Sequence, residues 1–189
     1  MSDFQPSRDE ARTLLNQYVK TPGMLKHSYA SEAVMRALAK RLGEDEHKWA
    51  VTGLLHDLDV ELTNADLSVH GLKTAEILKQ KNYPQDMIDA IKMHNEKAHG
   101  LKRSITFHHA LASAETMTGL IVATTLVYPD KKLSGVKPKS IVKRMKERAF
   151  AASVDRDIIR ECEKVGLHID EFAELALNAM RTISDKLGL

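Results

Sequence analysis

The sequence predicts an all-α fold. Apolar residues recur at helical spacing in one segment after another, turn residues separate these segments, and no segment shows sustained alternation of β-branched residues. The chain has 189 residues, of which 43% are hydrophobic, and no repeat or low-complexity linker divides it. A chain of this length and composition is expected to bury its core in a single domain, residues 1–189.

Caps and breakers mark the first three helices. Ser7 is expected to cap a helix that runs to about Lys20, before a Pro-Gly breaker. A second helix carries alanines, valine and leucines at helical spacing and ends at Gly43, which tolerates the left-handed conformation. Asp45 is expected to cap a third helix, which runs into the dipeptide His56-Asp57.

The same signals predict the remaining helices. A fourth helix is expected over about 67–81, a fifth over about 85–95, and a long apolar sixth over 105–127, before Pro129. Further helices are predicted at about 138–148, 155–165 and 169–187.

Composition limits the compartment and the partners. The single cysteine, Cys162, excludes an internal disulfide framework, and the polar N-terminus lacks the apolar core of a signal peptide. The longest apolar stretch, 119–128, is about half of the roughly 20 residues that a membrane span requires. We therefore expect a cytoplasmic protein with no membrane partner. The formal net charge of +2 does not by itself indicate a polyanionic partner.

Histidines and carboxylates interrupt the apolar faces of five successive helices. One such histidine alone is normally a core residue, but two buried carboxylates among four imidazoles need cations to hold them together. No thiolate lies near them in the pattern, which favours iron, manganese, cobalt or zinc over a soft metal. The sequence therefore predicts one or two divalent transition-metal ions. The candidate ligands are His27, His56, Asp57, His70, His94 and Glu115.

This ordered series resembles the HD superfamily of metal-dependent phosphohydrolases over most of the chain. His27 resembles the first histidine of the family, and His56 and Asp57 resemble its His-Asp pair. Glu115 stands where the family usually has an aspartate. His70 and His94 resemble the additional histidines of members that bind two metals. The spacing is closest to the bacterial diadenosine tetraphosphate hydrolases and is also similar to the cyclic-di-GMP phosphodiesterases.

Two features argue against the cyclic-di-GMP branch. Asn95 stands where that branch has a further histidine, and no Gly-Tyr-Pro sequence follows. The resemblance implies an HD-type metal-binding core at about 22–128 and a C-terminal helical extension at about 129–189. It implies hydrolysis of a small phosphorylated substrate, a phosphate ester or anhydride of the nucleotide or dinucleotide class.

Roles for the individual residues follow as a hypothesis. His27, His56, Asp57 and Glu115 are expected to hold one ion, while Asp57, His70 and His94 hold the other. Asp57 would then bridge the ions and act in catalysis. Asp59 is also a catalytic candidate, either by taking up a proton or by orienting a ligand imidazole. Glu61 is a candidate for the same orienting role.

The segment 131–148 is a candidate for substrate binding because it holds eight basic residues and one acidic residue. Lys139 and Lys143, one turn apart near a helix start, are expected to bind phosphate. A solvated helix face is the alternative, and a nucleic-acid partner is not expected because no aromatic residues interleave the charges. His108 lies two turns before Glu115 on the same face, where it is expected either to contact substrate or to pack in the core.

Two alternatives to hydrolysis stay open. A few HD-superfamily proteins with a ligand set of this kind are mixed-valent di-iron oxygenases. The Glu115 substitution would also suit a non-catalytic, metal-stabilised domain that binds a nucleotide or a partner. The sequence makes no prediction of the oligomeric state.

Overall fold

The computed structural model describes residues 6–189, and within them only helices and turns are found. The predicted all-α class is confirmed. No helix in this range is long and apolar enough to cross a membrane. In chain order the elements are α1 (Arg8–Tyr18), α2 (Pro22–Leu42), α3 (Glu46–Leu55), α4 (Leu72–Gln80), α5 (Gln85–His94), η1 (Glu96–Ala98), α6 (Thr106–Leu126), η2 (Leu133–Gly135), α7 (Pro138–Met145), α8 (Arg156–Ile159), η3 (Arg160–Val165), α9 (Ile169–Arg181) and α10 (Ser184–Leu187).

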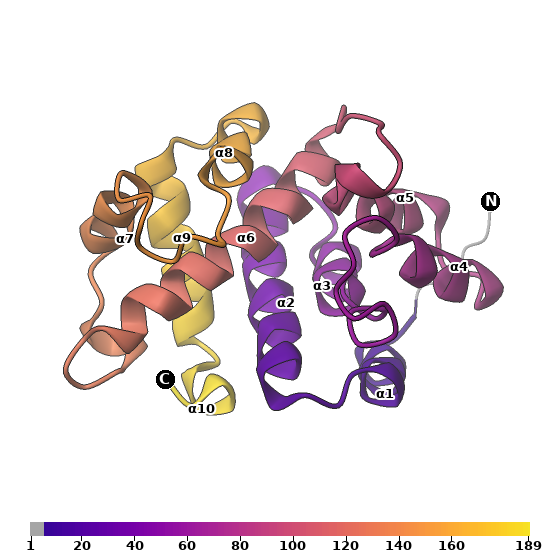
Figure 1. Ribbon diagram of the computed structural model, residues 1–189, viewed down its shortest axis with the longest axis horizontal. Helices are drawn as coiled ribbons and strands as arrows, with labels where there is room; N and C mark the ends of the chain where they lie inside the picture. Colours follow the sequence, from indigo (N-terminus) through magenta and orange to yellow (C-terminus); the bar gives the residue numbers. More distant parts are fainter. Residues whose placement is uncertain (1–5) are drawn as a thin grey trace.

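Two long helices, α2 and α6, form the centre of the molecule (Figure 1). The helices α1, α3, α4 and α5 lie on one side of α2, and α7 to α10 lie on the other side. The central helix α2 contacts α3, α6 and α9. The two central helices therefore connect the N-terminal and C-terminal parts of the fold, and side chains on them can reach both parts.

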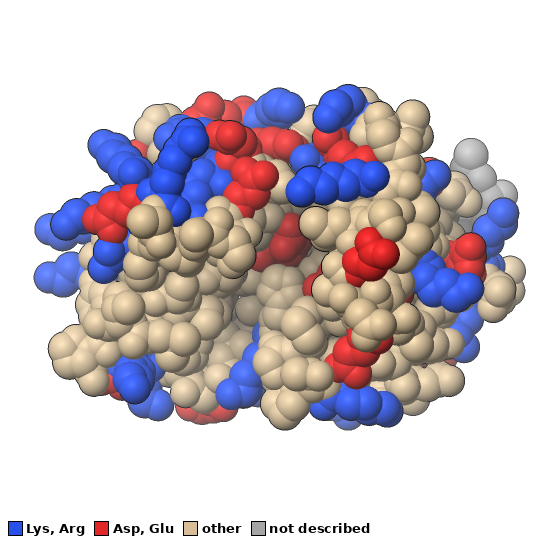
Figure 2. Space-filling view, viewed as in Figure 1, with Lys and Arg blue, Asp and Glu red and all other residues tan. Residues whose placement is uncertain are grey.

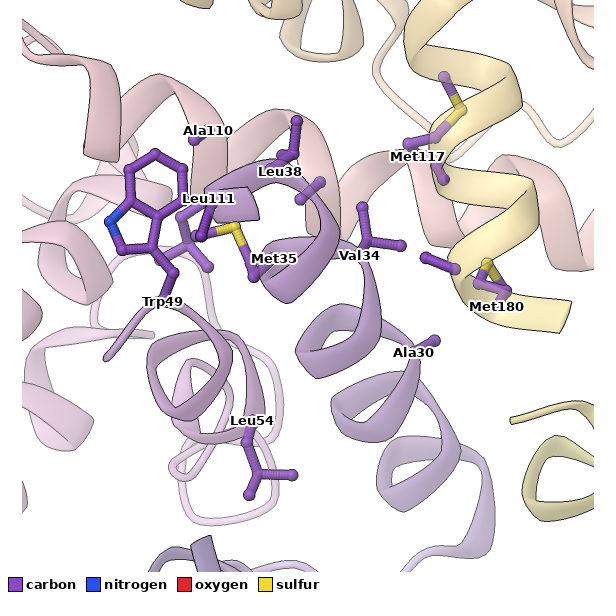
Figure 3. Close-up of a cluster of buried hydrophobic side chains, with 14 of the residues drawn as sticks. Ala30, Val34, Met35, Leu38, Trp49, Leu54, Ala110, Leu111, Met117 and Met180 are labelled. Atoms are coloured by element: carbon purple, nitrogen blue, oxygen red, sulfur yellow. The ribbon is translucent and has the colours of Figure 1, made fainter. Parts of the chain in front are cut away.

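The hydrophobic core surrounds α2 (Figure 3). Met35 and Leu38 point toward the side chains of α3 and α6, among them Trp49 and Leu111, while Val34 faces the methionines of α6 and α9. All of these side chains are almost completely buried. Burial of apolar surface is the main favourable term in folding, so this cluster fixes the positions of the central helices.

The helix ends follow the predicted caps. Ser7 forms a capping box with Glu10, in which each side chain bonds the backbone N–H of the other residue. Gly43 ends α2 in the left-handed conformation with φ 75°. The carboxylate of Asp45 accepts the N–H of Lys48 at the start of α3. These three predictions are confirmed.

The largest difference from the predicted helices lies between α3 and α4. The fourth helix begins at Leu72 and not at 67, because residues 56–71 form consecutive turns. Asn64 and Ala65 adopt positive φ in this segment, and Gly71 follows at φ 88°. A helix cannot continue through such positions. Leu67, in this turn segment, is 48% exposed.

The C-terminal helices are also shorter than predicted. The expected helix at 155–165 is divided into α8 and the 3-10 helix η3, and the expected helix at 169–187 is divided into α9 and α10. At the second division the hydroxyl of Thr182 donates to the carbonyl of Ala179. This local side-chain bond satisfies a carbonyl that the next helical turn would otherwise use.

Candidate metal centre

Five polar side chains converge where the ends of α3 and α5 approach α2. The Nε2 atoms of His27 and His56 lie 3.1 Å apart, and those of His70 and His94 lie 3.0 Å apart. Asp57 lies between the two pairs, with Oδ2 3.6 Å from Nε2 of His27 and Oδ1 3.0 Å from Nε2 of His70. One carboxylate therefore faces both pairs of imidazoles.

These atoms form two groups that suit metal ions. The first contains His27, His56 and Asp57, and the second contains Asp57, His70 and His94. Ligand atoms that surround one ion at about 2.1 Å lie about 3 Å from one another, which is the spacing of the nitrogen pairs. The donor set of imidazole and carboxylate suits divalent transition metals. The residues present therefore fit a two-metal centre in which Asp57 belongs to both groups.

The opposite ring nitrogen of each histidine has a partner outside the centre. In two of the four histidines Nδ1 faces a backbone carbonyl, and in a third it faces a hydroxyl that donates its own proton to another acceptor. Both kinds of partner can only accept, so Nδ1 of these three rings carries the proton. Such a bond fixes the tautomer and leaves the lone pair of Nε2 for a cation. The pairs are His56 with the Gly53 carbonyl at 2.8 Å, His94 with the Ile91 carbonyl at 2.5 Å, and His27 with the Thr118 hydroxyl at 3.0 Å, which itself donates to the Glu115 carbonyl.

The fourth histidine, His70, is held by Asp59. Oδ1 of Asp59 lies 2.7 Å from Nδ1 of His70, and Oδ2 accepts the backbone N–H groups of Gly71 and Thr74. Asp59 is fully buried and does not line the pocket at the centre. This position agrees with the predicted role of orienting an imidazole, and it does not agree with direct contact between Asp59 and a substrate.

Two further side chains hold the turns that carry these ligands. Glu61 accepts the backbone N–H groups of Lys20 and Thr21 at 3.0 and 2.7 Å, which joins the turn segment to the start of α2. The amide of Asn95 donates to the carbonyls of Leu67 and His70 at 2.8 and 2.9 Å. Sequence reasoning treated Asn95 only as a departure from a related branch and missed this role.

Two close approaches fix the backbone around the centre. A Cβ atom at Gly53 would lie 2.7 Å from the Ser31 carbonyl oxygen, so α3 packs directly against α2 at this point. A Cβ atom at Gly71 would lie 3.1 Å from the ring of His94, in addition to the strain of its positive φ. Glycine at these positions lets the backbone segments that carry the ligand pairs approach one another.

Burial and charge shift the pKa values of the centre strongly. Burial lowers the pKa of His56 to about 3, which keeps this imidazole neutral. Burial alone would raise the pKa of Asp57, but the neighbouring imidazoles of His56, His70 and His94 hold it well below its usual range. Burial opposes protonation of His70, yet the carboxylates of Asp57 and Asp59 raise its pKa to about 10. The cluster therefore stabilises positive charge between its carboxylates.

Glu115 lies beside the first group. Its Oε2 is 3.9 Å from Nε2 of His27, and its other oxygen accepts a hydrogen bond from the Thr116 hydroxyl. Glu115 does not belong to either compact group of ligand atoms. Burial raises the pKa of its carboxyl group, so a cation beside it would stabilise the ionised form.

The centre opens into a pocket of about 380 Å³. Figure 2 shows the corresponding hollow in the middle of this face, with acidic side chains in its depth. Asp57 and Glu115 line the pocket, and Val154, Asp155 and Ile158 from the C-terminal part close its other side. Among the described residues that line the pocket, Lys97 is the one with a positively charged side chain, and this side chain is exposed. Lys97 could not be predicted from the sequence, because its 3-10 helix η1 is too short to show a periodic pattern.

The three predicted substrate contacts lie elsewhere. Lys139 and Lys143 are exposed on α7 and do not line this pocket, and Nζ of Lys143 lies 3.9 Å from Glu147. This placement agrees with the alternative of a solvated helix face. His108 is buried, lies outside the pocket lining, and has a lowered pKa because of that burial. It agrees with the alternative of core packing.

Comparison with known proteins gives one match. A family model described as "HD domain" matches residues 24–132, which is more than half of the chain. No curated protein and no solved structure matches the chain. The matched range contains all four histidines and both carboxylates of the candidate centre.

Proposed function

Because the chain belongs to the HD domain family, a superfamily of metal-dependent phosphohydrolases, we propose that it hydrolyses a phosphate ester or anhydride at a two-metal centre. The observation that carries this proposal is the convergence of four Nε2 atoms around Asp57, with Nδ1 of each ring held from behind. In His27, His56 and His94 the proton lies on Nδ1, so the Nε2 lone pairs of these three rings face the centre, where they suit a cation.

The proposed centre has two ion positions that share Asp57. His27, His56 and Asp57 would hold one ion, with Glu115 beside it, while Asp57, His70 and His94 would hold the other. When bound, divalent ions supply Lewis acidity, which activates water and neutralises phosphoryl charge. Asp57 orients both halves of the centre, and Asp59 keeps the proton of His70 on Nδ1. Lys97 at the pocket supplies the cationic contact for a phosphate group.

Iron, manganese, cobalt and zinc all suit the donor set. A nucleotide or dinucleotide is the substrate class that we propose to test first. It is supported by the similarity of the ligand series to the diadenosine tetraphosphate hydrolases.

Metal analysis of protein purified without chelators tests the centre. We expect up to two transition-metal equivalents, and Asp57→Ala should lose both because its carboxylate faces both groups. His94→Ala should empty mainly the second position. Full metal retention by Asp57→Ala would contradict the bridging role.

The reaction itself is tested with a panel of nucleotides and simple phosphate esters in the presence of manganese. Release of phosphate or of a nucleotide product, lost in Asp57→Ala, is the expected result. Oxygen consumption by iron-loaded protein without phosphate release would instead favour the oxygenase alternative, and binding without turnover would favour the non-catalytic one.

A further inference from the structure

A second groove begins on the other side of His27. It has a volume of about 480 Å³ and lies between α2, α6 and the C-terminal α10. Ala30, Val122, Ala123, Leu126 and Leu187 supply most of its walls. Leu126, at the end of α6, is 50% exposed.

The groove adjoins the candidate metal centre, because His27 and Gly119 line both hollows. The side chain of His27 is 22% exposed, whereas that of His56 is completely buried. In Figure 2 the hollow in the middle of the face contains acidic side chains, and mainly uncharged atoms continue below them.

The two hollows differ in chemistry. The metal pocket contains Asp57, Glu115 and Asp155, and Lys97 also lines it. Among the described residues that line the groove there is no Asp or Glu, and Lys26 is the one Lys or Arg. The ammonium group of Lys26 lies over Gly188 at the rim, since a Cβ atom there would be 3.1 Å from Nζ. Such a wall suits an uncharged apolar group whose attached phosphate lies at the metals.

We propose that this groove binds the apolar organic group of the phosphorylated substrate while its phosphoryl group lies at the metal centre. The inference rests on the proposed function, and it adds the class of leaving group that the site prefers. An alkyl or aryl chain and the face of a nucleobase share the chemistry that the walls recognise. A bare polar phosphate would leave the groove unused.

Binding of phosphonates to the metal-loaded protein tests the groove without turnover. Methylphosphonate carries the phosphoryl mimic alone, whereas phenylphosphonate adds an apolar ring of the size that the groove accepts. We expect calorimetry to show about tenfold tighter binding of phenylphosphonate, equivalent to about 1.4 kcal/mol. Comparison of adenosine 5′-monophosphate with inorganic phosphate shows in a second arm whether a nucleobase gains the same advantage.

A matched pair of variants locates the effect. Ala123→Phe places a ring inside the groove, while Val127→Phe adds the same ring at an exposed position near the end of α6 that does not line the groove. We expect the ratio of the two phosphonate affinities to fall toward one in Ala123→Phe and to stay near the wild-type value in Val127→Phe. Ala123→Leu should give an intermediate ratio, and it replaces Ala123→Phe if that variant does not fold.

The outcomes separate this inference from the proposed function. If methylphosphonate binds only to metal-loaded protein but phenylphosphonate gains nothing, the groove inference is wrong and the metal centre stands. The groove inference is also wrong if phenylphosphonate still binds more tightly than methylphosphonate, by the wild-type ratio, in both Ala123→Phe and Ala123→Leu. If neither phosphonate binds in a metal-dependent manner, the proposed function fails, and the groove inference fails with it.

Discussion

At the scale of single residues, the centre depends on partners behind the ligands as much as on the ligands. Each histidine reaches the centre through Nε2 because Nδ1 is held by a carbonyl, a hydroxyl or a carboxylate. His70 is the one held by a charged group, and the same carboxylate caps α4. Partners of this kind commonly set metal affinity, so Asp59 offers a test that leaves all ligands in place.

Asp59→Asn should weaken the second metal position by about tenfold or more. In the wild type one oxygen of Asp59 faces Nδ1 of His70, and the other accepts the N–H groups of Gly71 and Thr74. An amide has a single oxygen, so the substituted side chain cannot serve both sets of donors, and this oxygen is a weaker acceptor than a carboxylate. Metal titration should show loss mainly at the group of Asp57, His70 and His94. Asp66→Asn is the matched control, because that exposed carboxylate caps only the N–H of Ser68. Equal loss in both variants would contradict a specific role for Asp59.

Lys97 and Lys143 can be compared directly. Lys97 lines the metal pocket and Lys143 does not, so Lys97→Ala should raise KM for a phosphorylated substrate about tenfold, equivalent to about 1.4 kcal/mol. Lys143→Ala should leave KM near the wild-type value. Metal content should not change in either variant. A raised KM in Lys143→Ala alone would return the phosphate contact to α7.

Glu115→Asp tests the residue that departs from the usual family pattern. Glu115 is on a long packed helix and already lies 3.9 Å from His27, so the shorter aspartate should fall short and weaken the first metal position. Glu115→Ala should weaken it further. Titration of manganese or iron into all three proteins measures the order. Wild-type affinity in Glu115→Ala would show that this residue is not a ligand.

At the scale of elements, helices with local signals were predictable and the turns between α3 and α4 were not. Ser7, Gly43 and Asp45 act through neighbours in sequence, and their caps are where the sequence predicted them. The segment 56–71 is shaped by distant contacts, namely Glu61 with the start of α2 and Asn95 with the His70 carbonyl. A periodic apolar pattern cannot report such contacts, so the fourth helix was predicted to begin too early.

The same reasoning applies to the ligand set. The six candidate ligands were found because charged and imidazole groups stood out on apolar faces. Asn95 and Lys97 lie at the short 3-10 helix η1 after α5, which is too short to show a periodic face for comparison. His108 lies two turns from Glu115 along the same helix, yet it does not line the pocket. Spacing along one helix does not show which neighbouring element covers that face.

The contact between α2 and α3 gives a prediction at this scale. Gly53→Ala would place a methyl group against the Ser31 carbonyl, so the helices must separate and stability should fall by about 1–3 kcal/mol. His27 and His56 come from these helices, so the first metal position should weaken as well. Gly23→Ala on α2 has open space and is the control. Thermal unfolding and metal analysis measure both effects, and an unchanged Tm in Gly53→Ala would contradict the close approach.

At the scale of the whole molecule, the C-terminal part completes the centre of the matched family region. Val154, Asp155 and Ile158 close the metal pocket from outside residues 24–132. A nearly buried ion pair makes a second connection, because Arg103 donates two hydrogen bonds to Glu161 and others to the carbonyls of Met93 and His94. His109 also lies 2.6 Å from Glu161. The helix that carries His94 is thus tied to η3.

Glu161→Gln should therefore destabilise the whole molecule and not only its C-terminal part. Removal of one partner from a buried ion pair typically costs about 3 kcal/mol or more. The side chain of Arg103 is only 5% exposed, and the carboxylate that stays beside it, Glu96, is 3.7 Å away. We expect a lower Tm in one cooperative transition, seen at the same temperature by helical circular dichroism and by release of bound metal. Glu163→Gln on the same 3-10 helix is the control, since that exposed carboxylate lies 3.8 Å from an exposed Arg160. If metal stays bound while part of the helical signal is lost, the C-terminal helices unfold separately and the single-domain prediction is wrong.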